Sequence, residues 1–77
     1  MNTTPSTGPD AVRELLHSLR NRLAAIDSAS RCIDRRFRDE GGLRESDRIF
    51  VEALKTNCEG AVSDTDELSD VLRKLME

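Results

Sequence analysis

The stretch from Asp10 to Glu40, DAVRELLHSLRNRLAAIDSASRCIDRRFRDE, decides the fold of this 77-residue chain. Apolar residues recur along it at alternating spacings of four and three positions, which is the heptad pattern of helices that pack side by side. The series is Val12, Leu16, Leu19, Leu23, Ile26, Ser30, Ile33 and Phe37. We therefore predict a helix from about 10 to 39 that turns this series toward a second helix.

A second heptad series runs through the C-terminal half of the chain. It comprises Val51, Leu54, Cys58, Ala61, Thr65, Leu68, Leu72 and Leu75. Gly41 and Gly42 separate the two series and permit the backbone angles of a tight turn. We predict a turn over 40–43 and a second helix over 44–76, which either Leu43 opens or Ser46 caps. The fold class is all-α, an antiparallel hairpin over 10–77 behind a tail at 1–9, whose sequence MNTTPSTGP has no apolar periodicity.

Two helices joined by so short a turn share a single line of contact, and a chain of this length has a marginal core. Apolar residues flanking the heptad series would stay exposed in a monomer. They are Leu15, Ala25, Ala29, Phe50 and Val62. We therefore expect the hairpin to form a homodimer, arranged as a four-helix bundle.

Composition argues against several classes of function. The formal charge is −3 and tryptophan and tyrosine are absent, so we expect no nucleic-acid partner. No apolar run reaches the length of a membrane span and the N-terminus has no apolar signal core, which predicts a cytoplasmic protein without a membrane partner. Cys32 and Cys58 fall at different levels of the hairpin, so we expect them reduced, and the one histidine lacks zinc-site spacing.

That histidine, His17, lies on the side of the first helix that faces water if the heptad series faces a second helix. Arg13, Glu14, Arg20 and Asn21 are three or four positions away and therefore share its face. Two guanidinium groups beside an imidazole would stabilise the charge of an incoming phosphoryl group.

The stretch HSLRNRLAAI, residues 17–26, resembles the phosphoacceptor box of sensor histidine kinases. In that box the histidine is followed by an acidic residue, an aliphatic residue, Arg or Lys, Asn or Thr, Pro and Leu, with small and aliphatic residues after them. Ser18 and Arg22 depart from the pattern, at the acidic and proline positions. The matching residues are His17, Leu19, Arg20, Asn21, Leu23 and Ile26. The ending DELSDVLRKL also looks like the second helix of the dimerisation and histidine phosphotransfer domain, so the resemblance covers about 10–76.

The resemblance implies a homodimer in which His17 accepts the γ-phosphoryl group of ATP and passes it to an aspartate of a response-regulator receiver domain. Arg20 would be the basic residue of the box, and Asn21 the residue that orients water in a phosphatase reaction. By the same analogy, the receiver would dock on four residues of the first helix, Leu15, Ser18, Arg22 and Ala25. Ser18 lacks the carboxylate of the usual acidic residue, and Arg22 leaves the helix straighter than proline would.

The chain has no room for an ATP-binding domain and no glycine-rich nucleotide loop. We expect it to bind no cofactor itself and to meet ATP only through the ATP-binding domain of a partner kinase. The alternative function is a helical dimerisation or adaptor module, or an inhibitor that docks on kinases or receivers, with His17 unmodified. The acidic run over 64–70 pairs with nearby arginines or supplies the missing carboxylate, and Gly60 marks either a flexible point or a neutral exposed site.

Overall fold

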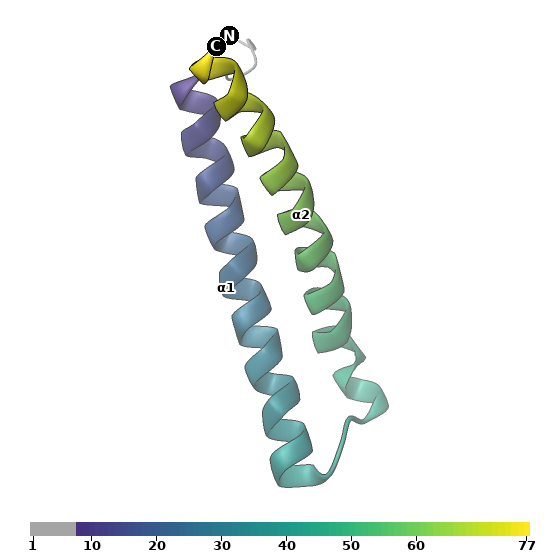
Figure 1. The fold of residues 1–77 in the computed structure, drawn as a ribbon. Helices are drawn as coiled ribbons and strands as arrows, with labels where there is room; N and C mark the ends of the chain where they lie inside the picture. The colour runs from purple at the N-terminus through teal and green to yellow at the C-terminus, as the bar shows by residue number, and fades with distance from the viewer. Residues whose placement is uncertain (1–7) are drawn as a thin grey trace, which may run out of the picture.

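The computed structural model describes residues 8–77, which form a helical hairpin (Figure 1). Helix α1 spans Pro9–Glu40 and helix α2 spans Arg48–Met76, with a 3₁₀ turn, η1, at Glu45–Asp47. The two helices run side by side in opposite directions, which confirms the predicted all-α hairpin. Pro9, which we had assigned to the tail, begins α1, and residues 1–7 of that tail lie outside the described residues. The radius of gyration, 16.8 Å, exceeds the roughly 11.5 Å of a compact domain of this length.

The turn between the helices depends on the paired glycines. Gly41 has a φ of 79° and Gly42 a φ of 155°, and backbone angles in this region are accessible to glycine at little cost. The Gly42 N–H donates to the carbonyl of Arg36 at 3.3 Å, which satisfies one of the carbonyl groups left free at the end of α1.

Asp47 fixes the start of α2. Its side chain is almost fully buried, at 2% exposed. One carboxylate oxygen accepts the backbone N–H of Arg44 at 2.9 Å, and the other accepts Nε of Arg36 on α1 at 3.0 Å. Glu40 forms ion pairs with both arginines. The second helix therefore begins at Arg48, four residues after the predicted bound at 44. The residue that fixes its start is Asp47, whereas we had predicted Leu43 or Ser46.

On α1 the contact between the helices uses a different heptad row from the one predicted, whereas on α2 it includes Leu54, Ala61 and Leu68 of the predicted series. Every residue at the contact is buried or half-buried, and both helices keep the alternating spacing of four and three. On α1 the row is Ala11, Leu15, Ser18, Arg22, Ala25, Ala29, Cys32 and Arg36. Opposite it, the row begins at Asp47 of η1 and continues on α2 with Phe50, Leu54, Asn57, Ala61, Asp64, Leu68 and Val71. The prediction that Leu15, Ala25, Ala29 and Phe50 stay exposed in a single hairpin is therefore wrong. Small side chains on α1 let the helices approach closely. Its two arginines pair with Asp64 of α2 and with Asp47 of η1.

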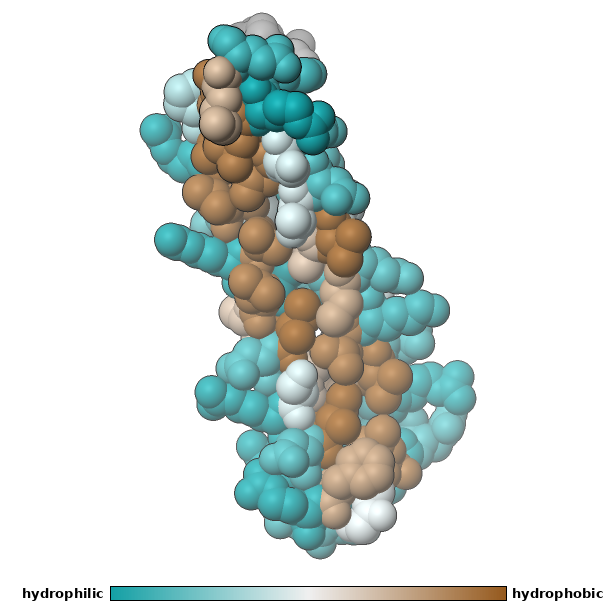
Figure 2. Space-filling model, viewed as in Figure 1, coloured by the Kyte–Doolittle hydropathy of each residue, from teal (hydrophilic) through white to brown (hydrophobic). Residues whose placement is uncertain are grey.

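The predicted row on α1 instead lies beside this contact and forms part of an apolar face that covers both helices (Figure 2). Leu23 is 53% exposed and Val62 is 63% exposed. We use "apolar face" for the large apolar side chains that are more than a third exposed along it. They are Leu16, Leu23 and Phe37 on α1 and Val51, Val62, Leu72 and Leu75 on α2. Val12, Leu19, Ile26 and Ile33 lie half-buried between them. Of the flanking residues predicted to be exposed, only Val62 is.

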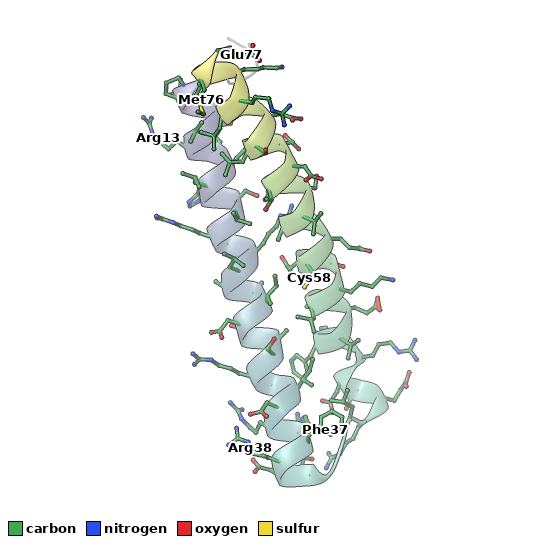
Figure 3. All side chains as sticks on the ribbon, in the orientation of Figure 1. Arg13, Phe37, Arg38, Cys58, Met76 and Glu77 are labelled. Carbon is green, nitrogen blue, oxygen red and sulfur yellow. The ribbon has the colours of Figure 1, made fainter. Side chains whose placement is uncertain are left out.

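Polar side chains project from the remaining sides of both helices (Figure 3). Cys32 is half-buried and Cys58 is exposed, and both cysteines are free, as predicted. None of the described helices combines the length and the apolar composition that a bilayer span requires.

Candidate functional site

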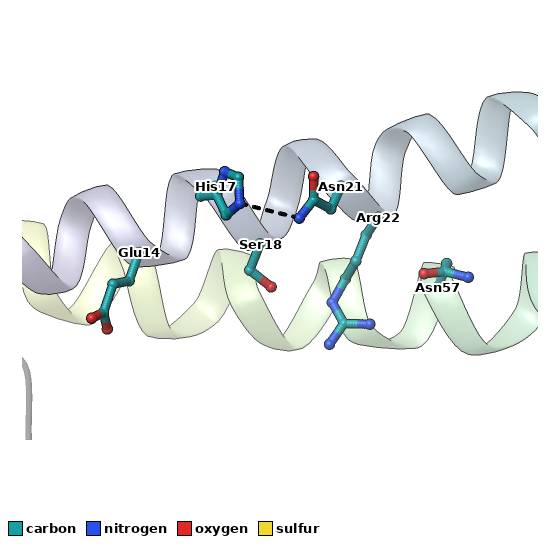
Figure 4. Close-up of a pocket in the computed structure, with 6 residues that line it drawn as sticks. All are labelled: Glu14, His17, Ser18, Asn21, Arg22 and Asn57. Carbon is teal, nitrogen blue, oxygen red and sulfur yellow. Dashed lines mark hydrogen bonds between the residues drawn. The ribbon is translucent and has the colours of Figure 1, made fainter.

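A shallow groove of about 380 Å³ runs between the helices, and Figure 4 shows the residues that line it. None of these residues belongs to the apolar face. Five of its lining residues come from two turns of α1, and Asn57 comes from α2. The lining residues are Glu14, His17, Ser18, Asn21, Arg22 and Asn57. A separate hollow opens between the same two helices on the apolar side, lined by Leu19, Leu23, Ala61, Val62, Thr65 and Asp66. The two faces of the hairpin therefore differ in chemistry, one polar and one apolar.

His17 is exposed at the rim of the polar groove. Its Nε2 atom lies 3.4 Å from Nδ2 of Asn21, one helical turn further along α1 (Figure 4). In the tautomer that carries its proton on Nδ1, the Asn21 amide donates a long hydrogen bond to Nε2. The imidazole is thereby oriented by a neighbour on its own helix while its ring remains open to other molecules.

Arg20, the other residue predicted to act with His17, is exposed but does not line this groove. Arg13 is also directed elsewhere, because its guanidinium contacts Asp10 at 3.5 Å. Neither of the two guanidinium groups predicted beside the imidazole therefore lines the groove. Glu14 and Asn21, which we also expected on this face, do line the groove with His17.

Below the groove, a buried carboxylate joins the helices. Asp64 on α2 is 8% exposed. Its Oδ2 atom accepts the Ser18 hydroxyl at 2.6 Å and Nε of Arg22 at 3.0 Å. The acidic run of α2 thus supplies an interhelical ion pair through Asp64, which is the salt-bridge role that we considered for it. We call Ser18, Arg22 and Asp64 the polar layer.

Hydrogen bonding holds the pKa of Asp64 below its ordinary value. The Ser18 hydroxyl is the main cause, and the hydrogen bond and charge of Arg22 act in the same direction, while burial opposes them. Asp47 at the turn also has a lowered pKa, chiefly through the backbone N–H of Arg44 and then through Arg36, again against the effect of burial. Both carboxylates are therefore ionised in the folded chain near neutral pH.

Gly60 leaves space for the polar layer. The Arg22 guanidinium lies against the α2 backbone at Gly60, so closely that a Cβ atom added there would collide with it. Neither of the roles that we considered for Gly60, a flexible point or a neutral exposed site, accounts for this contact. A Cβ atom at position 60 would require the end of the Arg22 side chain to move from its place against the α2 backbone.

The four predicted docking residues, Leu15, Ser18, Arg22 and Ala25, all lie in the row that faces α2 and are half-buried. Arg22 still exposes about a third of its side chain, 34%, at the groove. Docking of another protein on these residues would therefore engage their edges and the groove around them. Their role in docking remains a prediction.

Sequence reasoning missed Asn57, Asp47 and the specific partner of Arg22. Asn57 lines the groove and donates to the Ala53 carbonyl at 2.8 Å, within its own helix. One signal was available in the sequence: Asn57 and Asp64 are seven residues apart and interrupt a row of apolar residues on α2, as do Ser18 and Arg22 on α1. Across residues 8–77, no His, Cys, Asp and Glu side chains gather in a group that would hold a metal ion.

Comparison with known proteins gave no match of this chain to a family model, to a curated protein or to a solved structure.

Proposed function

We propose that this chain is a dimerisation and histidine phosphotransfer module of the histidine-kinase type, in which His17 accepts and donates a phosphoryl group. The observation that carries the proposal is the exposure of His17 at a polar groove on the side of the hairpin away from the apolar face. A second copy that covers the apolar face would leave the imidazole open to an enzyme. The resemblance of residues 17–26 to a phosphoacceptor box supplies the reaction type.

In the proposed reaction, a nitrogen lone pair of His17 attacks the γ-phosphorus of ATP that is bound to a separate kinase domain. The N–P bond forms, the bond from phosphorus to the β–γ bridging oxygen breaks, ADP leaves, and the ring N–H proton passes to solvent. A receiver aspartate then attacks the phosphorus, the N–P bond breaks, and the imidazole recovers a proton. Asn21 lies beside Nε2 and would orient the ring, or a water molecule that hydrolyses the product.

The proposed assembly is a homodimeric four-helix bundle in the cytoplasm. Its support is the apolar face, on which Leu16, Leu23 and Leu72 are each at least 41% exposed in the single hairpin. Burying a leucine contributes about 1.5–3 kcal/mol, so an uncovered row of such residues favours self-association. Its other partners would be a receiver domain and the ATP-binding domain of a kinase, and the chain would bind no cofactor itself.

The test is incubation with candidate histidine kinases and γ-labelled ATP, comparing the wild-type chain with His17→Gln. The wild-type chain should gain an acid-labile, base-stable label, and His17→Gln should gain none. Transfer of that label to a receiver domain would complete the relay. A wild-type chain that gains no label from any kinase whose own phosphoacceptor is labelled would contradict the phosphotransfer proposal.

A non-catalytic adaptor or inhibitor is the second candidate function, and one contact favours it. The Ser18 hydroxyl is committed to Asp64 at 2.6 Å, so the residue after the histidine provides no base for the imidazole. An adaptor would retain the apolar face and bind a kinase or receiver equally well with His17→Gln. Equal binding and equal inhibition by both forms, without labelling, would support this alternative.

A further inference from the structure

Charged residues border the apolar face along the outer edge of each helix. On α1, four charged residues each come one position after a half-buried apolar residue: Arg13, Arg20, Asp27 and Asp34. They are seven positions apart, so they lie along one line on the helix at intervals of two turns. On α2, the corresponding edge consists of Arg48, Lys55, Val62 and Ser69. Near the turn, the edge of α1 is therefore acidic and the edge of α2 is basic.

The register of the hairpin places these opposite charges at matching levels. Counting along the helices from the Ser18–Asp64 and Arg36–Asp47 contacts, Asp27 lies level with Lys55, and Asp34 lies level with Arg48. Within one hairpin these residues cannot meet, because both helices stand between the two outer edges.

Three of these four residues form exposed ion pairs with charges three or four positions away in the chain. Asp27 pairs with Arg31, Asp34 with Arg38, and Arg48 with Glu45. Lys55 is exposed and forms no ion pair within residues 8–77. Exposed pairs of this kind contribute little to stability and exchange readily for other partners.

We infer that these edge charges determine how a second copy of this chain docks on the apolar face. When two hairpins are related by a two-fold axis parallel to the helices, α1 of each lies on α2 of the other at the same level. Asp27 then meets Lys55 of the partner subunit, and Asp34 meets Arg48 of the partner subunit. The symmetry repeats both contacts, which gives four ion pairs around the interface.

The sizes of the apolar side chains favour the same arrangement. In the middle of the face, α1 presents Leu19, Leu23 and Ile26. At these levels α2 presents Val62 among the smaller Cys58, Ala61 and Thr65, so its side of the face carries less side-chain volume. A hollow of about 360 Å³ lies there, between Leu19 and Leu23 of α1 and the α2 residues Ala61, Val62, Thr65 and Asp66. Stacking α1 on α2 of the other copy brings large side chains onto small ones, as close packing requires.

An antiparallel copy is the competing arrangement. It would stack α1 on α1 and could pair Arg20 with Asp27 of the partner subunit. However, it would also bring the leucines of α1 onto one another and the smaller residues of α2 onto one another, which matches side-chain sizes less well. Size matching therefore favours the parallel copy, in which both His17 side chains lie at the same end of the bundle and on outer surfaces.

This inference rests on the homodimer of the proposed function, and charge reversal tests it directly. Lys55→Glu should weaken self-association roughly 10-fold at low ionic strength, as measured by sedimentation equilibrium, and so should Asp27→Lys. The double variant should recover most of the loss, because the reversed charges can pair again across the interface. Lys74→Glu, on an exposed position of α2 away from the apolar face, is the matched control and should leave association unchanged. Unchanged association of Lys55→Glu, or no recovery in the double variant, would overturn the inference.

Distances between spin labels distinguish the two arrangements independently of charge. In a chain with both cysteines replaced by alanine, one label is attached at Arg38→Cys near the turn, or at Lys74→Cys near the chain ends. A parallel dimer should give intersubunit distances under about 35 Å for both labels, because helices pack about 8–10 Å apart. An antiparallel dimer should separate each pair by roughly the 45 Å length of a 30-residue helix. Long distances, or a monomer, would overturn the inference. The His17 labelling assay gives a separate result, so the phosphotransfer proposal can fail or survive on its own.

Discussion

The guanidinium of Arg22 on α1 lies against the backbone of Gly60 on α2, where a side chain of any size would displace it. Glycine normally costs about 1 kcal/mol relative to alanine in a helix interior. The structure explains why the less favourable residue occupies this position, because the arginine reaches the buried Asp64 carboxylate across it.

This contact predicts non-additive substitutions at positions 22 and 60. In an Arg22→Ala background, Gly60→Ala should raise the free energy of unfolding by up to about 1 kcal/mol, through helix propensity alone. In the wild-type background the same substitution should gain less or destabilise, because it displaces Arg22 from Asp64. Urea unfolding of the four chains of the double-mutant cycle measures the difference. Equal effects of Gly60→Ala in both backgrounds would contradict the close contact.

The lowered pKa values of Asp47 and Asp64 predict loss of stability in acid. A carboxylate whose pKa is lower in the folded state stabilises the fold fully above its unfolded pKa, about 3.9 for aspartate. That contribution is lost as the pH falls through the folded pKa. Melting temperatures should therefore be steady from pH 7 to about pH 5 and fall below about pH 4. Asp47→Asn and Asp64→Asn should lower the melting temperature at pH 7 and flatten the acid decline. The exposed Asp10→Asn is the control, and an equal flattening by it would argue against these two residues as the cause.

The exposure of Leu23 predicts a substitution that affects assembly more than the hairpin itself. Leu23→Gln removes apolar surface that only a second copy would bury, twice per dimer, so the dissociation constant should rise by roughly 100-fold or more. Ala24→Gln, one position further along α1 and also exposed, is the matched control and should change the constant little. Dilution series monitored by sedimentation and circular dichroism provide the measurement. Similar effects of the two variants would show that the apolar face does not form the dimer interface.

The 3.4 Å contact between Asn21 and His17 predicts a change in the imidazole when the amide is lost. If the Asn21 amide donates to Nε2, the free chain favours the tautomer protonated on Nδ1 at high pH. Asn21→Ala should move the tautomer ratio toward the form protonated on Nε2, which is favoured in isolated histidine side chains in water. Nitrogen-15 chemical shifts of the ring report this ratio directly. Asn57→Ala, on the opposite wall of the groove, should leave it unchanged, and an unaltered spectrum in Asn21→Ala would rule out the orienting role.

Much of the fold was predictable because heptad spacing and paired glycines act locally. The residues Gly41 and Gly42 mark the turn, and the two heptad series mark the helices on either side. The facing row was not predictable by apolarity, since the strongest series on α1 lies beside the contact rather than in it. The helices instead meet through alanines and through polar residues that stabilise the fold only when paired. Their partners are distant in the sequence, as with Ser18 and Asp64, which are 46 residues apart.

The candidate site shows the same division. The exposure of His17 and its proximity to Asn21 follow from positions on one helix, and both were accessible to helical geometry. The absence of Arg20 from the groove and the contribution of Asn57 depend on which way α1 is rotated against α2. A rotation of α1 by one heptad row would change which residues of each helix line the groove. The sequence of α1 alone does not specify that rotation.

The two ionic contacts inside the hairpin, Arg22 with Asp64 and Arg36 with Asp47, also determine which alignment of the helices is allowed. A heptad repeat by itself tolerates sliding by seven residues, because each apolar residue finds an equivalent neighbour. Here such a slip would leave the carboxylate of Asp64 facing apolar side chains, either Ala25 and Ala29 or Ala11 and Leu15. An uncompensated charge would then be enclosed, which is strongly unfavourable. The charged residues of the contact thus disfavour alignments shifted by seven residues, and only one alignment of the two helices remains favourable.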